Sequence, residues 1–219
     1  MESLVYRERP AAGDPDGLLV LHHGRGTSEE DLLGLADALD PGRRLLVVTP
    51  RAPLQVVGLP GYHWYLVPRF GYPDPDTFHA ARGALAEFHD RLWEETAIPP
   101  TRTVLGGFSM GTVMSYTTAL DVGRPPVSGI LAFSGFVPEV EGWQPHFEDR
   151  RDTRTFVAHG RSDPIIGVDY AHRARGQLEA GGLGVEYHES DVDHRIDPAH
   201  LRAASEWLDA TLPASGPGP

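Results

Sequence analysis

The part of this chain best suited to chemistry surrounds Ser109, in the run Gly106-Gly107-Phe108-Ser109-Met110-Gly111. Glycines stand two residues before and two residues after the serine, a spacing that permits a very sharp turn. The apolar residues 103–105 predict a buried strand before the turn, and residues 112–116 predict a helix after it. A serine raised on such a turn can act as a nucleophile in acyl transfer. The alternative is an ordinary turn with a solvated serine, since the chain has 25 glycines.

A serine hydroxyl needs a base to take its proton and a carboxylate to orient that base. Two later loops offer these groups. Asp163 follows a predicted strand at 155–159, and His194 follows the last predicted strand. The carboxyl ends of parallel strands meet at one edge of a sheet, so we expect Ser109, Asp163 and His194 to lie together as a catalytic triad.

Other side chains could fill these roles. Asp163 taken alone also suits a turn or the start of a helix. Asp191 and Asp193 closely precede His194 and are the alternative acids. The chain has 11 histidines, and three of them in its last third lie inside predicted helices or a strand: His172, His188 and His200.

A tetrahedral intermediate would need two backbone N–H donors for its oxyanion. Met110, the residue after the serine, supplies one, and we assign the other to Arg25 in the run His23-Gly24-Arg25-Gly26. An ordinary glycine turn is the alternative for that run. The adjacent His22 and His23 suggest a metal site, but neighbouring strand residues point to opposite faces and do not easily share an ion. We therefore expect no metal and no other cofactor.

The rest of the chain alternates short apolar runs with amphipathic stretches. This alternation predicts an α/β fold with a mostly parallel central sheet and helices on both faces. Strands are predicted at 4–8, 17–22, 44–50, 102–108, 127–134, 155–159 and 185–188. Helices are predicted at 28–39, where Thr27 or Ser28 would be the cap, and at 76–96, 168–180 and 198–212.

No insertion is long enough for a separate cap domain. Residues 1–212 are therefore expected to form a single domain with its site in an open groove at the strand ends. The proline- and glycine-rich tail at 213–219 is expected to be disordered.

The composition excludes several classes of protein. A net charge of −12 argues against nucleic acid and against anionic membranes as partners. The absence of cysteine excludes disulfides and a cysteine nucleophile, and all 19 basic residues are arginine, which excludes a lysine Schiff base. We find neither a membrane-spanning run nor a signal-peptide pattern, so we expect a cytoplasmic protein and leave a homodimer open.

These motifs together resemble the phospholipase/carboxylesterase family of α/β hydrolases over residues 18–208. The matching pieces are L-H-H-G-R-G, E-D-L-L-G-L-A-D-A-L, G-G-F-S-M-G, F-S-G-F, H-G-R-S-D-P and D-H-R-I. The resemblance implies an α/β-hydrolase fold without a cap domain and a serine esterase with the triad Ser109, Asp163 and His194. Many family members have glutamine and two glycines after the serine, where this chain has Met110-Gly111-Thr112, so detailed substrate preference does not carry over.

The resemblance also implies that the segment 61–68 lines the acyl or alcohol pocket. We expect its Trp64 and Tyr65 to contact substrate, with plain core packing as the alternative. Phe136, which precedes Val137, and Ile165 are expected to contact substrate as well. These side chains suit an uncharged acyl ester.

We therefore predict a serine carboxylesterase that hydrolyses short- to medium-chain esters of small molecules through an acyl-enzyme intermediate. A lysophospholipase or acyl thioesterase with the same triad is the alternative. A dienelactone hydrolase is less favoured, because its nucleophile is typically cysteine. A non-catalytic binding protein of this fold would usually lack one member of the triad.

Overall fold

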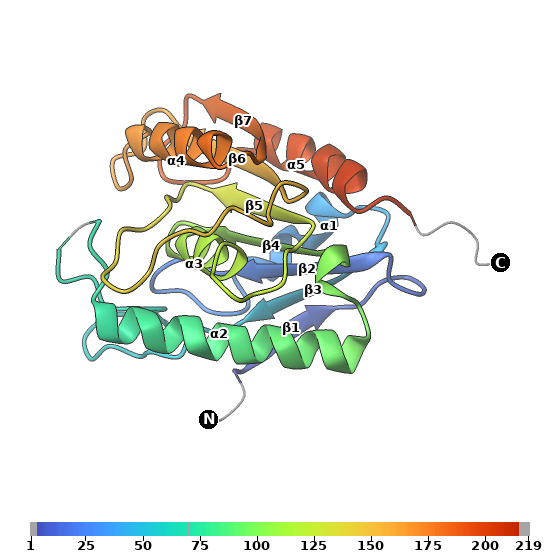
Figure 1. Ribbon diagram of the computed structural model, residues 1–219, viewed down its shortest axis with the longest axis horizontal. Coiled ribbons are helices and arrows are strands. Elements are labelled where there is room, and N and C mark those ends of the chain that lie inside the picture. The colour runs from blue at the N-terminus through green and yellow to red at the C-terminus, as the bar shows by residue number, and fades with distance from the viewer. Residues whose placement is uncertain (1–3, 70, 215–219) are drawn as a thin grey trace.

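The structure is a computed structural model that describes residues 4–69 and 71–214. One sheet runs through it, with the strand order β1-β3-β2-β4-β5-β6-β7 (Figure 1). β1 pairs antiparallel with β3, and every other neighbouring pair is parallel. The strands are β1 (Tyr6–Arg9), β2 (Gly17–His22), β3 (Leu45–Pro50), β4 (Thr103–Phe108), β5 (Gly129–Phe133), β6 (Arg154–Gly160) and β7 (Gly184–Ser190).

Helices cover both faces of this sheet. They are α1 (Ala36–Leu39), α2 (Pro75–Thr96), α3 (Met110–Ala119), α4 (Asp169–Ala180) and α5 (Pro198–Thr211), with short 3₁₀ helices η1 (Leu33–Leu35) and η2 (Pro100–Arg102). α2, α3 and α4 pack on one face, and α1 and α5 pack on the other (Figure 1). The predicted α/β architecture is confirmed. None of the helices in the described part of the chain is both long and apolar enough to cross a bilayer.

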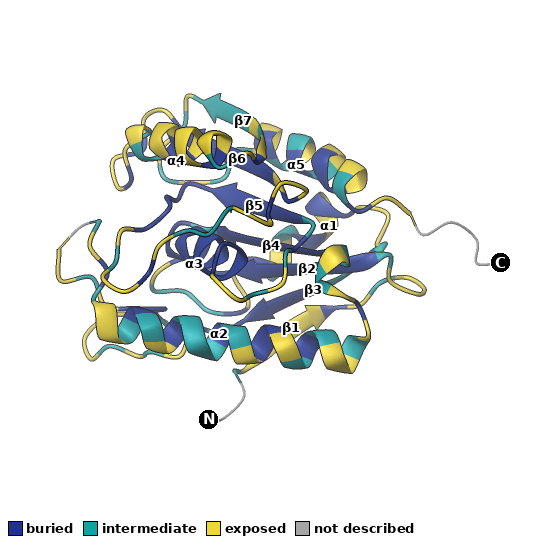
Figure 2. Cartoon of the chain, viewed as in Figure 1, coloured by how far each residue is buried: buried dark blue, intermediate teal, exposed yellow. Residues whose placement is uncertain are grey.

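β2 explains why the sheet needs cover on both sides. All of its residues are buried. Leu18 and Val20 belong to the core under α2 and α3, whereas Leu19 and Leu21 belong to the core under α1 and α5. Strand residues alternate between the two faces, so a continuous apolar run must be covered on both. In Figure 2 the central strands are buried, while α2 and α4 expose their outer faces.

The predicted helix at 28–39 is wrong over most of its length. Only the 3₁₀ helix η1 and the four-residue α1 form there, and neither has a side-chain cap. Glu29 is buried and pairs with Arg51, which holds residues 29–32 in turns. Gly34 lies within η1, and a glycine costs a helix roughly 1 kcal/mol relative to alanine. The other predicted elements are present, with their ends shifted by three residues or fewer.

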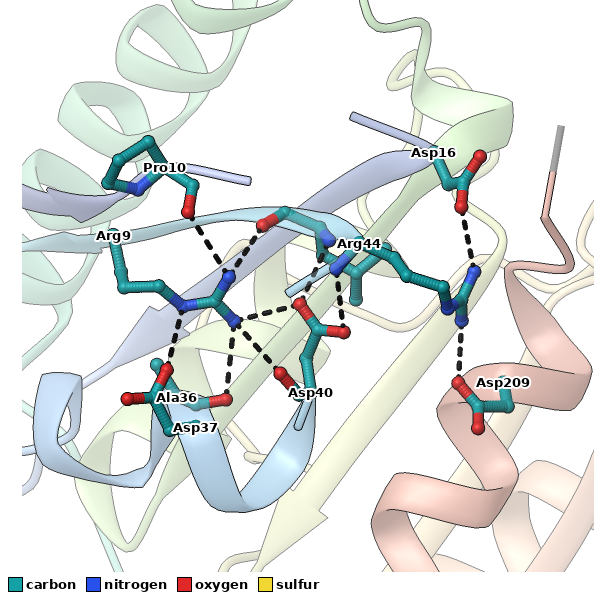
Figure 3. A network of polar contacts seen from close by, with 9 residues as sticks. Arg9, Pro10, Asp16, Ala36, Asp37, Asp40, Arg44 and Asp209 are labelled. Atoms are coloured by element: carbon teal, nitrogen blue, oxygen red, sulfur yellow. Dashed lines mark hydrogen bonds and ion pairs between the residues drawn. The ribbon is translucent and has the colours of Figure 1, made fainter. Parts of the chain in front are cut away.

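A buried arginine ties the edge of the sheet to α1 (Figure 3). Arg9 in β1 donates to the Asp40 carboxylate at 2.8 Å and to the carbonyl oxygens of Ala36 and Leu45 at 3.3 and 3.1 Å. The Asp40 carboxylate also accepts from the backbone N–H groups of Arg44 and Leu45. This network ends α1, starts β3 and keeps β1 and β3 in register.

The carboxyl ends of the parallel strands lie along one edge of the sheet. The loop 23–27 follows β2, and Ser109 follows β4. Asp163 comes after β6, and His194 comes after β7. The fold therefore carries all four segments to the same edge. Of the tail predicted to be disordered, Pro213 and Ala214 are exposed, and residues 215–219 lie outside the described residues.

Candidate active site

Ser109 lies on a strained turn between β4 and α3. Its backbone has φ 56° and ψ −118°, a conformation that costs a non-glycine residue about 1–3 kcal/mol. A Cβ on Gly107 would lie 2.5 Å from the carbonyl carbon of Gly111, and a Cβ on Gly111 would collide with the carbonyl oxygen of His22. Both glycines are therefore required where β2, β4 and α3 approach one another. Ser109 itself is 8% exposed and lies on the wall of a cavity.

Hydrogen bonds join the three residues predicted to form the triad. His194 Nε2 lies 2.9 Å from Ser109 Oγ, and His194 Nδ1 lies 2.6 Å from Asp163 Oδ2. With its proton on Nδ1, the imidazole donates to the carboxylate and leaves Nε2 to accept the proton of the serine hydroxyl. The structure thus brings together side chains that are 85 and 31 positions apart in the sequence.

The Asp163 carboxylate is completely buried and well supplied with donors. Its Oδ1 accepts the backbone N–H groups of Ile165 and Ile166, each at 2.8 Å, while Oδ2 receives His194. The His159 ring lies 3.4 Å from Oδ2 and donates from Nε2 to the carbonyl oxygen of Ile166 at 2.7 Å. Burial lowers the pKa of His159, so this ring is neutral at pH 7. These contacts hold the carboxylate in one orientation toward His194.

The alternative acids and bases have other partners. Asp191 pairs with an arginine at 2.7 Å, and Asp193 pairs with another at 3.0 Å. Within the described ranges, Ser109 Oγ has no histidine partner except His194. The other three histidines considered bond to glutamates or lie within a helix: His172, His188 and His200.

Hydrogen bonds hold the loop 23–27 in place beside the serine. His23 Nε2 accepts the backbone N–H of Ala52 at 3.0 Å, and His23 Nδ1 donates to the carbonyl oxygen of Gly24 at 2.7 Å. Trp64 Nε1 donates to the carbonyl oxygen of His23 at 2.9 Å. Burial lowers the pKa of His23, which keeps the ring neutral and Nε2 available as an acceptor. The loop is therefore anchored through both a ring and its own backbone.

Arg25 and Met110 carry the backbone N–H groups predicted to face an oxyanion. Both residues line the same cavity as Ser109. Neither N–H has an acceptor among the residues that the structure describes. Met110 is also the first residue of α3, where the helix dipole places partial positive charge. Two unoccupied donors and a helix N-terminus therefore accompany the serine.

His22 and His23 have different hydrogen-bond partners. His22 Nδ1 lies 2.8 Å from Ser115 Oγ, and His22 Nε2 lies 3.3 Å from His89 Nε2. Burial lowers the pKa of His22 well below its usual range and that of His89 to about 3, so both rings are neutral at pH 7. Across residues 4–69 and 71–214, no group of three or more histidine, aspartate or glutamate side chains is arranged to hold a metal ion.

A cavity of about 100 Å³ with mainly apolar walls lies beside Ser109. Three of the residues predicted to contact substrate line it: Tyr65, Phe136 and Ile165. A second cavity of about 170 Å³ adjoins the first, and Phe136 lines both. The second cavity has polar walls that include Glu139 and Arg173. An apolar chain is therefore accommodated well only in the first.

The prediction that Trp64 contacts substrate is wrong. Its side chain is 0% exposed and is absent from the cavity wall. The indole packs against the rings of His22 and His23, with centroid distances of 5.6 and 5.3 Å. Trp64 therefore supports the loop 23–27 from the core, whereas its neighbour Tyr65 lines the cavity.

Thr112 is a supporting residue that the sequence analysis did not recognise. Its Oγ1 lies 2.7 Å from the carbonyl oxygens of both Gly107 and Phe133, and so bridges the ends of β4 and β5. A Cβ on Gly135 would collide with its side chain. The sequence carries no signal for this role, because the burial that requires its hydroxyl to find a partner is visible only in the structure.

A mostly parallel sheet that presents a serine on a sharp strand–helix turn, with acid and base after later strands, is the architecture of α/β hydrolases. Within that class, the chain belongs to the phospholipase/carboxylesterase family, whose model matches residues 9–212. This is a family of hydrolases that cleave ester and thioester bonds.

Individual relatives cover nearly the whole chain. Acyl-protein thioesterase 1 of Yarrowia lipolytica is 26% identical over 221 residues, which is 93% of this chain and 95% of the relative. The crystal structure of esterase PE8 superposes with a TM-score of 0.83 and 27% identity, and the match covers 96% of this chain and 100% of that one. The carboxylesterase of Bacillus cereus has the same fold, with a TM-score of 0.83, 23% identity and coverage of 95% and 94%.

Proposed function

We propose that the protein is a serine hydrolase that cleaves carboxylic esters of small molecules through an acyl-enzyme intermediate. The hydrogen-bonded series Ser109–His194–Asp163 carries this proposal. The open donors on Arg25 and Met110 support it, because an acyl-transfer intermediate needs donors where its negative charge develops.

In the first half of the reaction, His194 Nε2 takes the hydroxyl proton while Ser109 Oγ bonds to the carbonyl carbon of the ester. The carbonyl oxygen becomes an oxyanion that accepts the N–H groups of Arg25 and Met110. The buried Asp163 carboxylate stabilises the imidazolium. Collapse of the intermediate breaks the bond to the alcohol oxygen, which leaves with the proton from His194. Water then repeats the sequence on the acyl-enzyme, releasing the acid and restoring Ser109.

Short to medium acyl groups suit the cavity best. The first cavity is small and mainly apolar, and a longer chain would have to pass Phe136 into the polar second cavity. A buried methylene contributes about 0.8 kcal/mol only when it reaches apolar surroundings. Chain extension beyond the first cavity should therefore gain little.

A thioesterase activity at the same site is the second candidate. Its support is similarity in sequence: acyl-protein thioesterase 1 of Yarrowia lipolytica matches almost the full chain. The proposed chemistry also serves a thioester, whose leaving thiolate needs less help from a proton donor. Oxygen esters and thioesters of one acyl group, measured side by side, decide which bond is preferred.

We further propose that residues 1–212 act as one catalytic domain in the cytoplasm. A single sheet from β1 to β7 that carries both sides of the site supports the domain. The absence of cysteine from the sequence supports the compartment.

The test of the function is hydrolysis of p-nitrophenyl esters from acetyl to palmitoyl, together with labelling by a fluorophosphonate probe. We expect turnover with an optimum at short or medium chains, and labelling that Ser109→Ala abolishes. Ser109→Ala should lower kcat by roughly 10³-fold or more. A folded Ser109→Ala protein with normal turnover would contradict the proposal, and an optimum at palmitoyl would favour the lysophospholipase alternative.

A further inference from the structure

An unpaired cation stands at the cavity beside Ser109. Arg25 is exposed and lines this cavity, and its guanidinium makes no hydrogen bond or ion pair within the part of the chain that the structure describes. Many other arginines are paired with carboxylates, such as Arg51 with Glu29 and Arg82 with Asp121. Arg25 has no such partner, and none of the described residues around the cavity carries a carboxylate.

Acidic partners for an arginine are scarce only around this cavity. The chain has 31 acidic residues against 19 basic ones, so carboxylates are abundant elsewhere. At the cavity a single exposed positive charge stands beside walls that are mainly apolar. Such a site attracts a negative group on whatever enters it.

Tyr65 adds a second unpaired donor to the same cavity. Its side chain is only 3% exposed, and its ring packs edge-on against Phe78 at a centroid distance of 5.7 Å. The hydroxyl forms no hydrogen bond with another described residue, and it is not among the fully buried unpaired polar atoms, so its oxygen opens to the cavity. Tyrosine hydroxyls in protein interiors usually have a partner. The side chain lines the cavity, so a bound molecule can supply that partner.

The electrostatics of Tyr65 agree with this placement. Burial raises the pKa of Tyr65 above its usual value, so the phenol keeps its proton and acts as a donor. The positive charge of Arg25 acts on the pKa of Tyr65 in the opposite direction, and both residues line the same cavity.

We propose that this cavity selects esters that carry a second, anionic group, which the guanidinium of Arg25 and the hydroxyl of Tyr65 bind. The inference rests on the proposed ester hydrolysis and names its substrate class. A carboxylate is the simplest such group, and it can belong either to the acyl part or to the alcohol part of the ester. A charged hydrogen-bonded pair of this kind should favour the anionic ester by about 10- to 100-fold in kcat/KM.

Two matched pairs of substrates test the proposal and separate the two sources of the anion. Monoethyl glutarate and its neutral isostere ethyl 5-amino-5-oxopentanoate differ in the acyl part. 3-Acetoxybenzoate and 3-acetoxybenzamide differ in the alcohol part. For each pair the result is the ratio of kcat/KM for the anionic ester to that for the neutral one. We expect a ratio of about 10 or more in at least one pair.

The variants act on this ratio. Arg25→Leu keeps the backbone N–H and removes the charge, so the ratio should fall about 10-fold or more. A general loss of activity lowers kcat/KM for both esters alike and therefore cancels in the ratio. Tyr65→Phe should lower it a few-fold, and Arg25→Lys should retain part of it. Arg91→Leu is the matched control, because Arg91 lies on α2 outside this cavity and its loss leaves the ratio unchanged.

The outcomes are separable from those of the proposed function. Neutral esters that turn over, with ratios near one in wild type or with ratios unaltered by Arg25→Leu, would leave the esterase intact and overturn the anion site. If no ester turns over, the esterase fails, and titration with glutarate still tests the site. Glutarate should then bind Ser109→Ala about 10-fold more tightly than the Ser109→Ala/Arg25→Leu double variant, and equal affinities would overturn the proposal.

Discussion

The two loops that approach Ser109 are built in opposite ways. The loop 23–27 is fastened from beneath by the buried His23 and Trp64. The segment 190–197, which carries His194, lies nearer the surface, and its neighbouring charges form ion pairs with exposed arginines. Donors for an oxyanion must be in place before the reaction, whereas a base must accept a proton and pass it on. The buried loop 23–27, here called the rigid side, suits the first task. The segment 190–197, here called the accessible side, suits the second.

Loss of the base should have the largest effect. His194→Ala removes the group that takes the proton of Ser109, so kcat on an activated ester should fall by roughly 10³-fold or more. The fall of kcat/KM in acid should vanish with it, because protonation of this imidazole would no longer matter. His188→Ala is the control, since that ring bonds to Glu186 and not to the serine. A His194→Ala protein that keeps the acid limb would refute the assignment.

The action of His194 also depends on the buried carboxylate of Asp163. Asp163→Asn keeps the shape but replaces an acceptor with an amide that cannot stabilise the imidazolium, so kcat should fall by about 10²- to 10⁴-fold. Asp193→Asn should change kcat little, because Asp193 pairs with Arg195 at the surface. The pair of variants is compared by steady-state kinetics, and the reverse order of effects would make Asp193 the acid.

On the rigid side, Trp64 should affect stability more than substrate choice. Trp64→Ala empties a fully buried site and should lower the free energy of unfolding by about 3–5 kcal/mol. Trp64→Phe keeps most of the packing but leaves the carbonyl of His23 without its donor, so it should cost about 1–3 kcal/mol. Urea unfolding measures both. If Trp64→Ala left the urea midpoint unchanged and shifted the acyl-length profile, Trp64 would be a substrate-contacting residue after all.

Buried histidines beneath the rigid loop should make stability fall in acid. Burial lowers the pKa of His89 to about 3 in the fold, whereas an unperturbed histidine has a pKa of about 6.5. Below about pH 6.5 the unfolded chain therefore binds a proton that the folded one does not. Stability therefore falls as pH drops from about 6.5 toward 3, by about 1.4 kcal/mol per pH unit for this one group.

His89→Leu removes that group and should make the fall with pH shallower in urea unfolding between pH 7 and 4.5. Ser115→Ala is the control, since it removes a contact of His22 without removing a histidine. If His89→Leu and wild type lost stability at the same rate, the buried neutral His89 would not be a cause of the acid destabilisation.

The smallest expected effect concerns the wall between the two cavities. Phe136→Ala should enlarge the mainly apolar first cavity by the space that the ring occupies, so each further methylene buried there should raise kcat/KM by up to about fourfold, from its roughly 0.8 kcal/mol. The acyl-length optimum should then move to longer esters. Val122→Ala removes an exposed side chain elsewhere and should leave the profile as it is. An unmoved optimum in Phe136→Ala would show that this ring does not limit chain length.

Local sequence pattern was sufficient to predict most of the fold. Continuous apolar runs such as residues 17–22 identify strands buried on both faces, and the helical spacing of 76–96 identifies α2. It failed at 28–39, where the partner of Glu29 lies at Arg51, far along the chain. A helical pattern in the sequence cannot register a distant ion pair that holds the backbone in turns.

The sequence by itself determined which residues stand at strand ends, because glycine spacing and apolar runs are local properties. It therefore singled out Ser109, Asp163 and His194 before any contact between them was known. Tertiary structure alone decided that Tyr65 lines the cavity while its neighbour Trp64 lies in the core, and that no carboxylate among the described residues lines the cavity with Arg25. Those outcomes depend on how segments distant in sequence pack in space, and pairing between distant side chains leaves no periodic trace in the chain.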